Sequence, residues 1–214
     1  VRIAQYRHCR TRSAVVMSRH VSRNVNLEST RRRLTERQAD TVQRLTQAAV
    51  EVLREEGFAG LTVRMVASRA GVAPATAYTY FSSKEHLVAE VFWRRLATEA
   101  AVEPAPGQAD GNRADRVSAV LRGIALLMAG EPELAAAVTS ALLGQDPDVE
   151  HLRARIGLEI RERLSAALGP GADPDELEAL ELLYAGALVR AGMGYGTYEK
   201  LADRLEVSAR LLLE

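Results

Sequence analysis

Residues 61–87 combine small, hydroxyl-bearing and aromatic side chains with two short helical patterns. In the first pattern, apolar residues recur at the spacings of one helix face, at Val63, Val66, Ala67 and Ala70. Gly71 follows where a tight turn needs positive φ, and Pro74 presets the first turn of a second helix. Two short helices joined in this way form a helix-turn-helix, whose second helix is suited to enter the major groove of DNA.

The second helix of this motif has an outer face without charge. Its inner residues are Ala77 and Phe81, and its outer residues are Pro74, Ala75, Thr76, Tyr78, Thr79 and Tyr80. Small side chains let a helix approach base edges closely, and hydroxyl groups can hydrogen-bond to bases or phosphates. A face that meets only water normally carries Glu and Lys. The pattern therefore favours a DNA-reading helix over an ordinary helical hairpin, which is the alternative.

The next helix starts with Ser82-Ser83-Lys84-Glu85, which predicts a capping box between Ser82 and Glu85. Lys84 adds a cation near the positive end of the helix dipole, and that position is unfavourable unless an anion lies nearby. A DNA phosphate bound by Lys84 and by the free amides of the first turn would remove the conflict. We therefore expect Lys84 to contact DNA.

Helical patterns continue through most of the chain, and we predict an all-α fold of about nine helices. Thr35 and Gln38 predict a capping box at the first helix, and Gly57 is suited to end it. Expected helices span residues 35–57, 62–70, 74–81, 83–101, 113–129, 132–143, 148–168, 174–193 and 197–213. The chain then divides into an arm (1–33), a helix-turn-helix domain (34–82), a connecting helix (83–102), a linker (103–111) and a C-terminal domain (112–214).

The arm is basic although the whole chain of 214 residues has a formal net charge of zero. Residues 1–33 hold nine Arg against the single acid Glu28, and they have no helical or strand period. We predict a disordered arm that either contacts DNA, best through residues 31–33, or only aids solubility. Met17 is a second candidate for the translation start.

The composition argues against a secreted, membrane or enzymatic protein. Cys9 is the single cysteine, and no apolar run or leading signal suits a membrane helix or export, so we expect a soluble cytoplasmic protein without disulfides. The four histidines, at positions 8, 20, 86 and 151, are scattered, and no zinc spacing, nucleophile elbow or phosphate loop is evident. We therefore expect no metal, no cofactor and no enzymatic activity.

The C-terminal helices have wider apolar stripes than one core needs. A homodimer interface would cover the excess, and the candidates are Leu180, Leu183, Ala187, Leu205 and Leu212. Large or adaptable side chains that would line a cavity for an apolar ligand are Trp93, Met128, Tyr184 and Met193. Core filling is the alternative role for each of these residues.

The motif resembles the tetracycline-repressor (TetR) family of bacterial transcription regulators. The matching residues are Gly57-Phe58, Leu61-Thr62, Arg64, Val66-Ala67, Ala70-Gly71-Val72, Tyr78, Tyr80-Phe81 and Ser83-Lys84-Glu85-His86-Leu87. The resemblance implies an N-terminal three-helix DNA-binding domain and a C-terminal ligand-binding and dimerising domain. It also implies phosphate contacts by Thr62 and Lys84, backbone contacts by Tyr78 and Tyr80, and base-edge positions for Arg64, Ala75, Thr76 and Thr79.

The family resemblance implies a homodimeric repressor that binds a palindromic operator and leaves it when a small apolar effector binds. The chain departs from the family pattern at Ala73, where Ser or Thr would cap the recognition helix, and at Ala75-Thr76-Ala77, so no relative's operator can be copied. Residues 63–67 and 201–213 are similar to actinobacterial repressors of sterol and fatty-acid catabolism, which implies a lipid, acyl-CoA or sterol derivative as effector. The alternative is a helical small-molecule-binding or scaffold protein without DNA-binding activity.

Overall fold

The structure is a computed structural model that describes residues 35–100 and 112–214. Over these residues it is all-α, which confirms the predicted fold class. The helices are α1 (Glu36–Gly60), α2 (Val63–Arg69), α3 (Pro74–Tyr80), α4 (Lys84–Ala100), α5 (Arg113–Leu126), α6 (Pro132–Leu143), α7 (Pro147–Leu168), α8 (Pro174–Gly192) and α9 (Tyr198–Leu213). The predicted arm and linker, with Cys9, Met17 and residues 31–33, lie outside the described residues.

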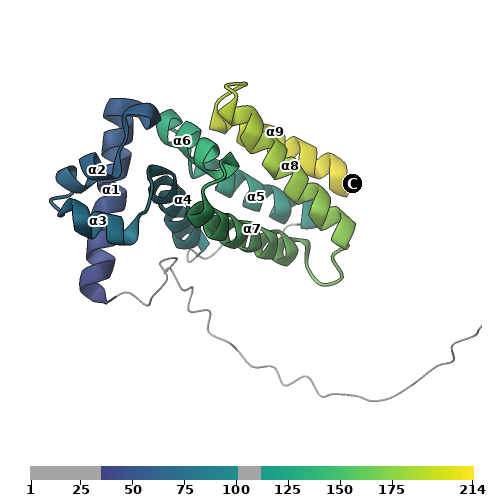
Figure 1. Ribbon diagram of the computed structural model, residues 1–214. Coiled ribbons are helices and arrows are strands. Elements are labelled where there is room, and N and C mark those ends of the chain that lie inside the picture. The colour runs from purple at the N-terminus through teal and green to yellow at the C-terminus, as the bar shows by residue number, and fades with distance from the viewer. Residues whose placement is uncertain (1–34, 101–111) are drawn as a thin grey trace, which may run out of the picture.

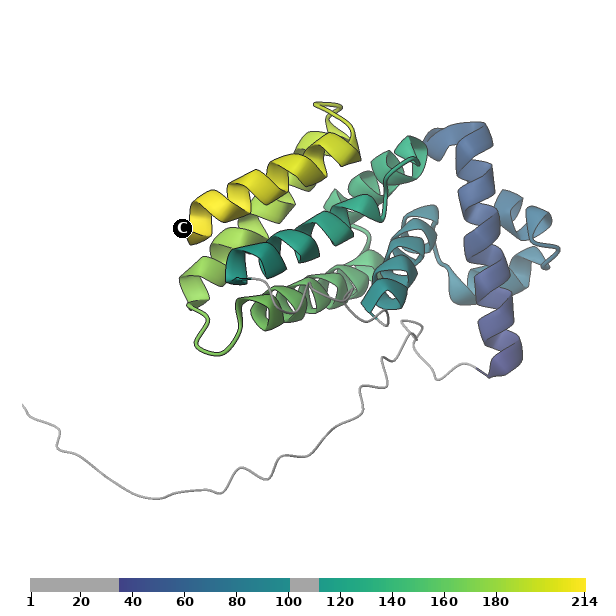
Figure 2. The ribbon, with the colours of Figure 1, turned by 180° about the vertical axis from the view of Figure 1, so that it is seen from behind.

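The helices form two groups that share α4. In Figure 1, α1, α2 and α3 lie at one end of the molecule, and α5 to α9 form a bundle at the other. Helix α4 packs against α1 on one side and against α6 and α7 on the other, while α1 also contacts α6 directly. Figure 2 shows the same arrangement from behind, with α1 beside the near end of α6. The helix-turn-helix is therefore attached to the bundle through both α1 and α4.

Apolar faces at helical spacing account for the packing of both groups. In the first group, Leu45, Leu53, Val66 and Phe81 are fully buried, so α1, α2 and α3 share one small core. In the bundle, the large fully buried side chains include Leu121, Ile124, Leu134, Leu152 and Leu164. Within the described ranges, no helix has the length and hydropathy needed to span a membrane.

The ends of α1 follow the sequence signals. The Thr35 N–H donates to Gln38 Oε1 at 2.8 Å and the Gln38 N–H donates to Thr35 Oγ1 at 3.4 Å, which confirms the capping box. Gly57 has φ of 65°, as predicted for a helix-ending residue, but the chain kinks there and makes another short turn to Gly60. The Leu61 N–H then donates to the Gly57 carbonyl at 3.1 Å and caps the C-terminus of α1.

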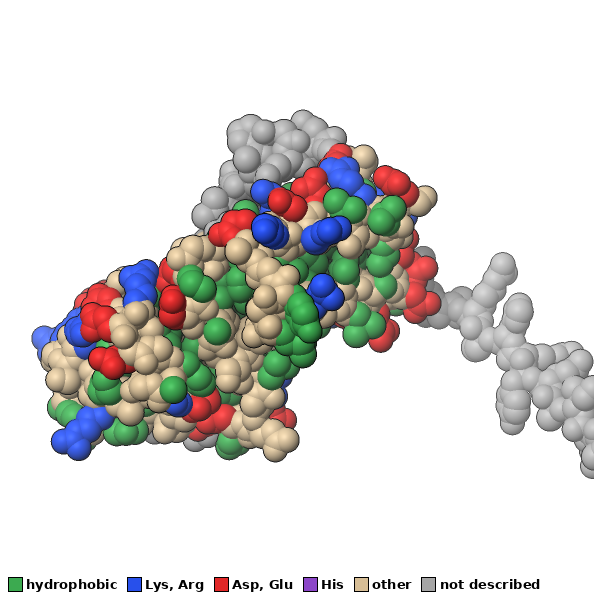
Figure 3. All heavy atoms as spheres, turned by 90° about the horizontal axis from the view of Figure 1, so that it is seen from above, with side chains coloured by type: hydrophobic (Ala, Val, Ile, Leu, Met, Phe, Trp, Pro, Cys, Tyr) green, Lys and Arg blue, Asp and Glu red, His purple; other side chains and the backbone are tan. Residues whose placement is uncertain are grey.

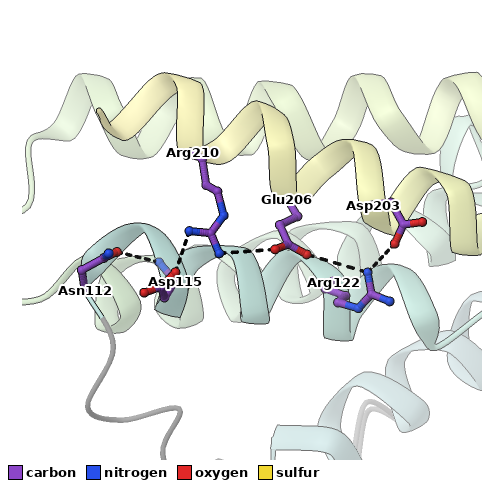
Figure 4. A network of polar contacts seen from close by, with 6 residues as sticks. All are labelled: Asn112, Asp115, Arg122, Asp203, Glu206 and Arg210. Carbon is purple, nitrogen blue, oxygen red and sulfur yellow. Dashed lines mark hydrogen bonds and ion pairs between the residues drawn. The ribbon is translucent and has the colours of Figure 1, made fainter.

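Ion pairs attach the last helix to α5. Arg210 of α9 lies 2.6 Å from Asp115, and Arg122 of α5 lies 2.6 Å from Asp203 (Figure 4). Glu206 lies between the two arginines, 3.3 Å from Arg210 and 3.9 Å from Arg122. These contacts fix α9 against α5, and Val207 and Leu211 of α9 are exposed.

Close packing between α6 and α8 makes Gly192 sensitive to substitution. A Cβ atom at Gly192 would lie 2.5 Å from Thr139 Cγ2 and 3.1 Å from Thr139 Cβ. We expect Gly192→Ala to lower the free energy of unfolding by about 1–3 kcal/mol, because the two helices must separate. Urea unfolding measures this loss. Gly157→Ala on α7 is the matched control, since its Cβ meets nothing within 4 Å. Equal stability of both variants would contradict the predicted clash.

Candidate nucleic-acid interface

The turn between α2 and α3 is held by an arginine from α1. Gly71 has φ of 63°, which only glycine adopts readily, and it separates the two helices as predicted. Arg44 Nη2 donates to the Gly71 carbonyl at 3.1 Å and to the Ala70 carbonyl. The sequence analysis missed Arg44, because nothing in the local pattern connects it to a turn 26 residues later. Arg44 fixes α3 relative to α1 before any DNA is bound.

The outer face of α3 is open to solvent. Ala75, Thr76, Tyr78 and Thr79 are exposed, and Tyr80 is half-buried. Ala73 precedes the helix without a side-chain cap, in agreement with the expected departure from the family pattern. The face therefore presents the uncharged small and hydroxyl-bearing residues that the sequence placed there, and Ala77 anchors the helix from inside.

The hydroxyl of Thr79 has a restricted hydrogen-bonding role. Its Oγ1 donates to the Ala75 carbonyl at 3.0 Å, one turn earlier in the same helix. The hydroxyl hydrogen is therefore used, and the oxygen lone pairs remain for an outside donor. Exocyclic amino groups of adenine and cytosine are such donors in the major groove.

Thr62 and Arg64 lie at the start of α2, and both are exposed. Thr62 caps the helix, because its Oγ1 accepts the Met65 N–H at 3.1 Å. The Thr62 hydroxyl hydrogen is not used by this cap, so it can be donated to a phosphate oxygen. Arg64 follows two positions later on the exposed side.

The electrostatic reason for expecting a phosphate at Lys84 is wrong. Lys84 Nζ donates to the Phe58 carbonyl at 2.8 Å, and it lies 4.5 Å from the centroid of the Phe58 ring. The end of α1 therefore compensates the cation within the chain, through a carbonyl and a cation–π contact. Lys84 is half-buried and belongs to the junction between α1 and α4. A phosphate contact stays a prediction, but it is not needed to explain the residue.

The predicted capping box between Ser82 and Glu85 is also wrong. Ser83 caps α4, because its Oγ accepts the His86 N–H at 2.9 Å. Ser82 instead donates to Asp148 Oδ2 at 2.6 Å and so connects the motif to α7. Nearby, burial alone would raise the pKa of Asp146, but hydrogen bonds from Ser83 and from backbone N–H groups at the start of α7 lower it.

Three of the four candidate effector residues are buried in the protein, and one is not. Trp93, Met128 and Tyr184 are buried, whereas Met193 is exposed at the end of α8 and does not join them. Among the described residues, the Trp93 Nε1 and the Tyr184 hydroxyl have no hydrogen-bond partner. The Arg155 guanidinium lies 4.4 Å from the centroid of a Trp93 ring. Two buried donors thus remain unsatisfied, which is unusual in a packed core.

The same helix carries a buried acid that the sequence analysis did not single out. Glu90 of α4 is fully buried, and its Oε1 accepts from Arg94 Nε at 2.9 Å, while Oε2 has no hydrogen-bond partner among the described residues. Burial raises the pKa of Glu90 to about 7, although the charges of Arg94 and Arg155 oppose the shift. Only the fold could show this, because Glu at such a position normally faces water.

The face formed by α8 and α9 contains a surface groove of about 800 Å³. Its lining includes three of the predicted interface residues, Leu183, Ala187 and Leu205. Leu180 and Leu205 are both buried within the protomer, but only Leu205 lines the groove, while Leu212 is exposed near the C-terminus. Exposed apolar side chains of α8, α9 and the turn between them include Leu182, Tyr195, Val207 and Leu211. Leu182, Val207 and Leu211 belong to the apolar stripes of the sequence, whereas Tyr195 was not singled out there. Figure 3 shows hydrophobic side chains between Lys and Arg side chains on the upper surface of the molecule.

No cluster of three or more His, Cys, Asp or Glu side chains suited to a metal ion occurs in the described part of the chain.

Comparisons with known proteins agree with this geometry. Residues 45–91 match the family model "Bacterial regulatory proteins, tetR family". An HTH-type transcriptional regulator of Mycobacterium tuberculosis is 50% identical over 181 residues, covering 83% of this chain and 82% of that protein. The HTH-type transcriptional repressor KstR of Rhodococcus jostii is 27% identical, covering 82% of this chain and 84% of its own length.

The fold is also similar to that of solved structures. A TetR transcriptional regulator from Rhodococcus sp. RHA1 aligns with a TM-score of 0.68 at 23% identity, over 83% of this chain and 98% of that chain. FadR from Bacillus subtilis, solved in complex with stearoyl-CoA, aligns with a TM-score of 0.56 at 19% identity, over 78% of this chain and 96% of that chain. The similar proteins are regulators and not enzymes, which confirms the expected absence of an enzymatic role. The chain belongs to the TetR family of bacterial helix-turn-helix transcriptional regulators.

Proposed function

We propose that the protein is a homodimeric repressor that binds a palindromic operator and is released by a small, largely apolar effector. The main supporting observation is the open, uncharged face of α3, held in place by Arg44. Such a face has no evident use in a protein that only binds small molecules. Binding to DNA that flanks the protein's own gene, measured by fluorescence anisotropy at several salt concentrations, tests this function. A failure to bind any such fragment would favour the alternative of a ligand-binding or scaffold protein.

Thr79 is proposed to read a base, and its substitution gives a sharp test. Thr79→Val keeps the shape of the side chain but removes the oxygen, so discrimination at one operator position should fall by about 1–3 kcal/mol. Affinities for operators changed one base pair at a time measure this effect. Thr98→Val is the matched control, because Thr98 is also exposed and donates to the carbonyl one turn earlier, at 2.8 Å, on α4. An equal loss on every operator would show that Thr79 does not read sequence.

The homodimer is proposed to form through the α8–α9 groove. The groove has an apolar middle, with the cations Arg190, Lys200 and Arg204 in its lining. The first turn of α8, at the other end of that helix, carries Asp175 and Glu176. A two-fold axis across this face would bring the acidic end of one protomer toward the basic end of its partner, which gives complementary charges. Thr62, Arg64 and α3 of the two protomers would then contact successive major grooves, about 34 Å apart.

The effector is proposed to bind beside Trp93 and Tyr184, whose buried N–H and O–H groups have no partner among the described residues. These donors suit a ligand with an apolar body and an oxygen acceptor, such as a fatty acyl or sterol derivative. The stearoyl-CoA bound to FadR supports acyl-CoA as a first candidate. Helix α4 carries Trp93 and reaches the helix-turn-helix at Lys84, so displacement of Trp93 would move the α3 helices of the dimer.

Effector binding and operator binding are expected to oppose each other by the same factor, because coupling between two sites is reciprocal. Trp93 is the single tryptophan of the chain, so its fluorescence reports directly on a ligand beside it. Stearoyl-CoA and a sterol acyl-CoA are titrated against free protein and against operator-bound protein. The expected result is weaker binding to the complex, by about 5- to 150-fold. Equal affinity for both forms would contradict the proposed release.

A further inference from the structure

The turn between α5 and α6 holds a carboxylate that joins three helices. Glu131 precedes the first turn of α6, where a side chain normally caps the helix, but it makes no cap hydrogen bond. Its Oε1 instead accepts a hydrogen bond from Arg95 Nη2 of α4 at 2.8 Å. Its Oε2 lies 3.2 Å from Arg54 Nη2 of α1 in an ion pair, and it has no hydrogen-bond partner among the described residues. Arg95 Nη1 also donates to the Leu127 carbonyl of the same turn, at 3.0 Å. We name Glu131, Arg54 and Arg95 the α1–α4–α6 clamp.

The clamp is more sheltered than ordinary surface ion pairs. The Glu131 side chain is 20% exposed and Arg95 is 27% exposed, whereas Arg54 is 54% exposed. Loss of either arginine leaves a partly buried carboxylate with one partner, and loss of the carboxylate leaves two neighbouring cations. The orientation of α1 against the turn therefore depends on an intact carboxylate.

Several parts of the protein meet at this turn. Met128, near its start, is buried in the core. On the other side, hydrogen bonds from Thr197 and from the N–H groups of Glu199 and Gly130 lower the pKa of Glu199, so the turn also touches the start of α9. Helix α1, in turn, holds the α2–α3 turn through Arg44. Helix α1 thus connects this turn to the turn that precedes the recognition helix.

We propose that Glu131 is a positioning residue through which the C-terminal domain sets the orientation of the DNA-binding domain, by a route through α1 that is separate from the continuous helix α4. This proposal rests on the proposed function for its effect on operator binding, but the position of the domain is measurable without DNA. Glu131 contacts no base or phosphate in this role. It acts through Arg54 and α1.

The position of the domain is measured by electron spin resonance in the full chain. Spin labels are attached at Ser68→Cys on α2 and Glu162→Cys on α7, both exposed sites, in a Cys9→Ser background diluted with unlabelled protein, and operator binding is measured on the unlabelled variants. We expect Glu131→Gln to broaden the distance distribution between the labels, and to weaken operator binding about tenfold. Helicity and oligomeric state should stay as in the unsubstituted protein.

Glu181→Gln is the matched control, because Glu181 pairs with Arg161 at 2.6 Å between α7 and α8, away from α1. It should leave the distances unchanged even if its melting temperature falls as much as that of Glu131→Gln. Adding Arg54→Met to Glu131→Gln should cause little further change in the distances, because the two substitutions remove the same ion pair between Arg54 and Glu131. Unchanged distances in Glu131→Gln, or additive effects in the double variant, would overturn the proposal. If neither the unsubstituted protein nor any variant binds an operator, the proposed function is wrong. The distances between the labels still test whether Glu131 positions the domain.

Discussion

Replacing Leu182 by Arg is expected to convert the proposed dimer into monomers and to lower operator affinity on the order of 100-fold or more. Leu182 is 67% exposed and lines the α8–α9 groove beside Arg190 and Arg204. Its burial against a partner protomer would contribute apolar contact, and an arginine there would be desolvated among other cations. A monomer presents one α3 helix instead of two, so it loses the contacts to one half-site.

Sedimentation velocity and operator anisotropy measure the two effects of Leu182→Arg separately. Leu158→Arg is the matched control, because Leu158 of α7 is 58% exposed and lies outside the groove. The control should stay dimeric and keep its affinity for the operator. A Leu182→Arg protein that remains a dimer would show that the protomers associate through another face.

The second large expected effect concerns the pH dependence of stability, and it arises from Glu90. Burial raises the pKa of Glu90 to about 7 in the folded protein, from an ordinary value of 4.5. Between these two pH values the folded state binds a proton that the unfolded state has released. The free energy of unfolding therefore falls as pH rises through this range, by about 3 kcal/mol in total.

Glu90→Gln cannot titrate and should lack this part of the pH dependence. We expect the stability of the unsubstituted protein, relative to Glu90→Gln, to fall by about 2–3 kcal/mol between pH 5 and pH 8. Urea unfolding of both proteins at a series of pH values measures the difference. Parallel curves for the two proteins would show that Glu90 keeps an ordinary pKa in the fold.

The helices and the helix-turn-helix were predictable from the sequence because their signals are local. Val63, Val66 and Ala67 repeat at the helical period, Gly71 supplies the positive φ, and the Thr35–Gln38 capping box lies within one turn. The open face of α3 was predictable for the same reason, since Ala77 and Phe81 already define its buried side.

The tertiary structure alone decided the partners of the charged residues and the outer surface of the C-terminal domain. Lys84 meets Phe58, Arg44 meets Gly71, and Arg54 meets Glu131, each across many residues of chain. An apolar period shows that a helix has a buried face, but not which neighbour covers it or how far the burial extends. Leu180 and Leu182 therefore look alike in the sequence, whereas the packing of α8 buries the first and leaves the second exposed. The physical reason is that these contacts depend on the angles between helices, which no single helix encodes.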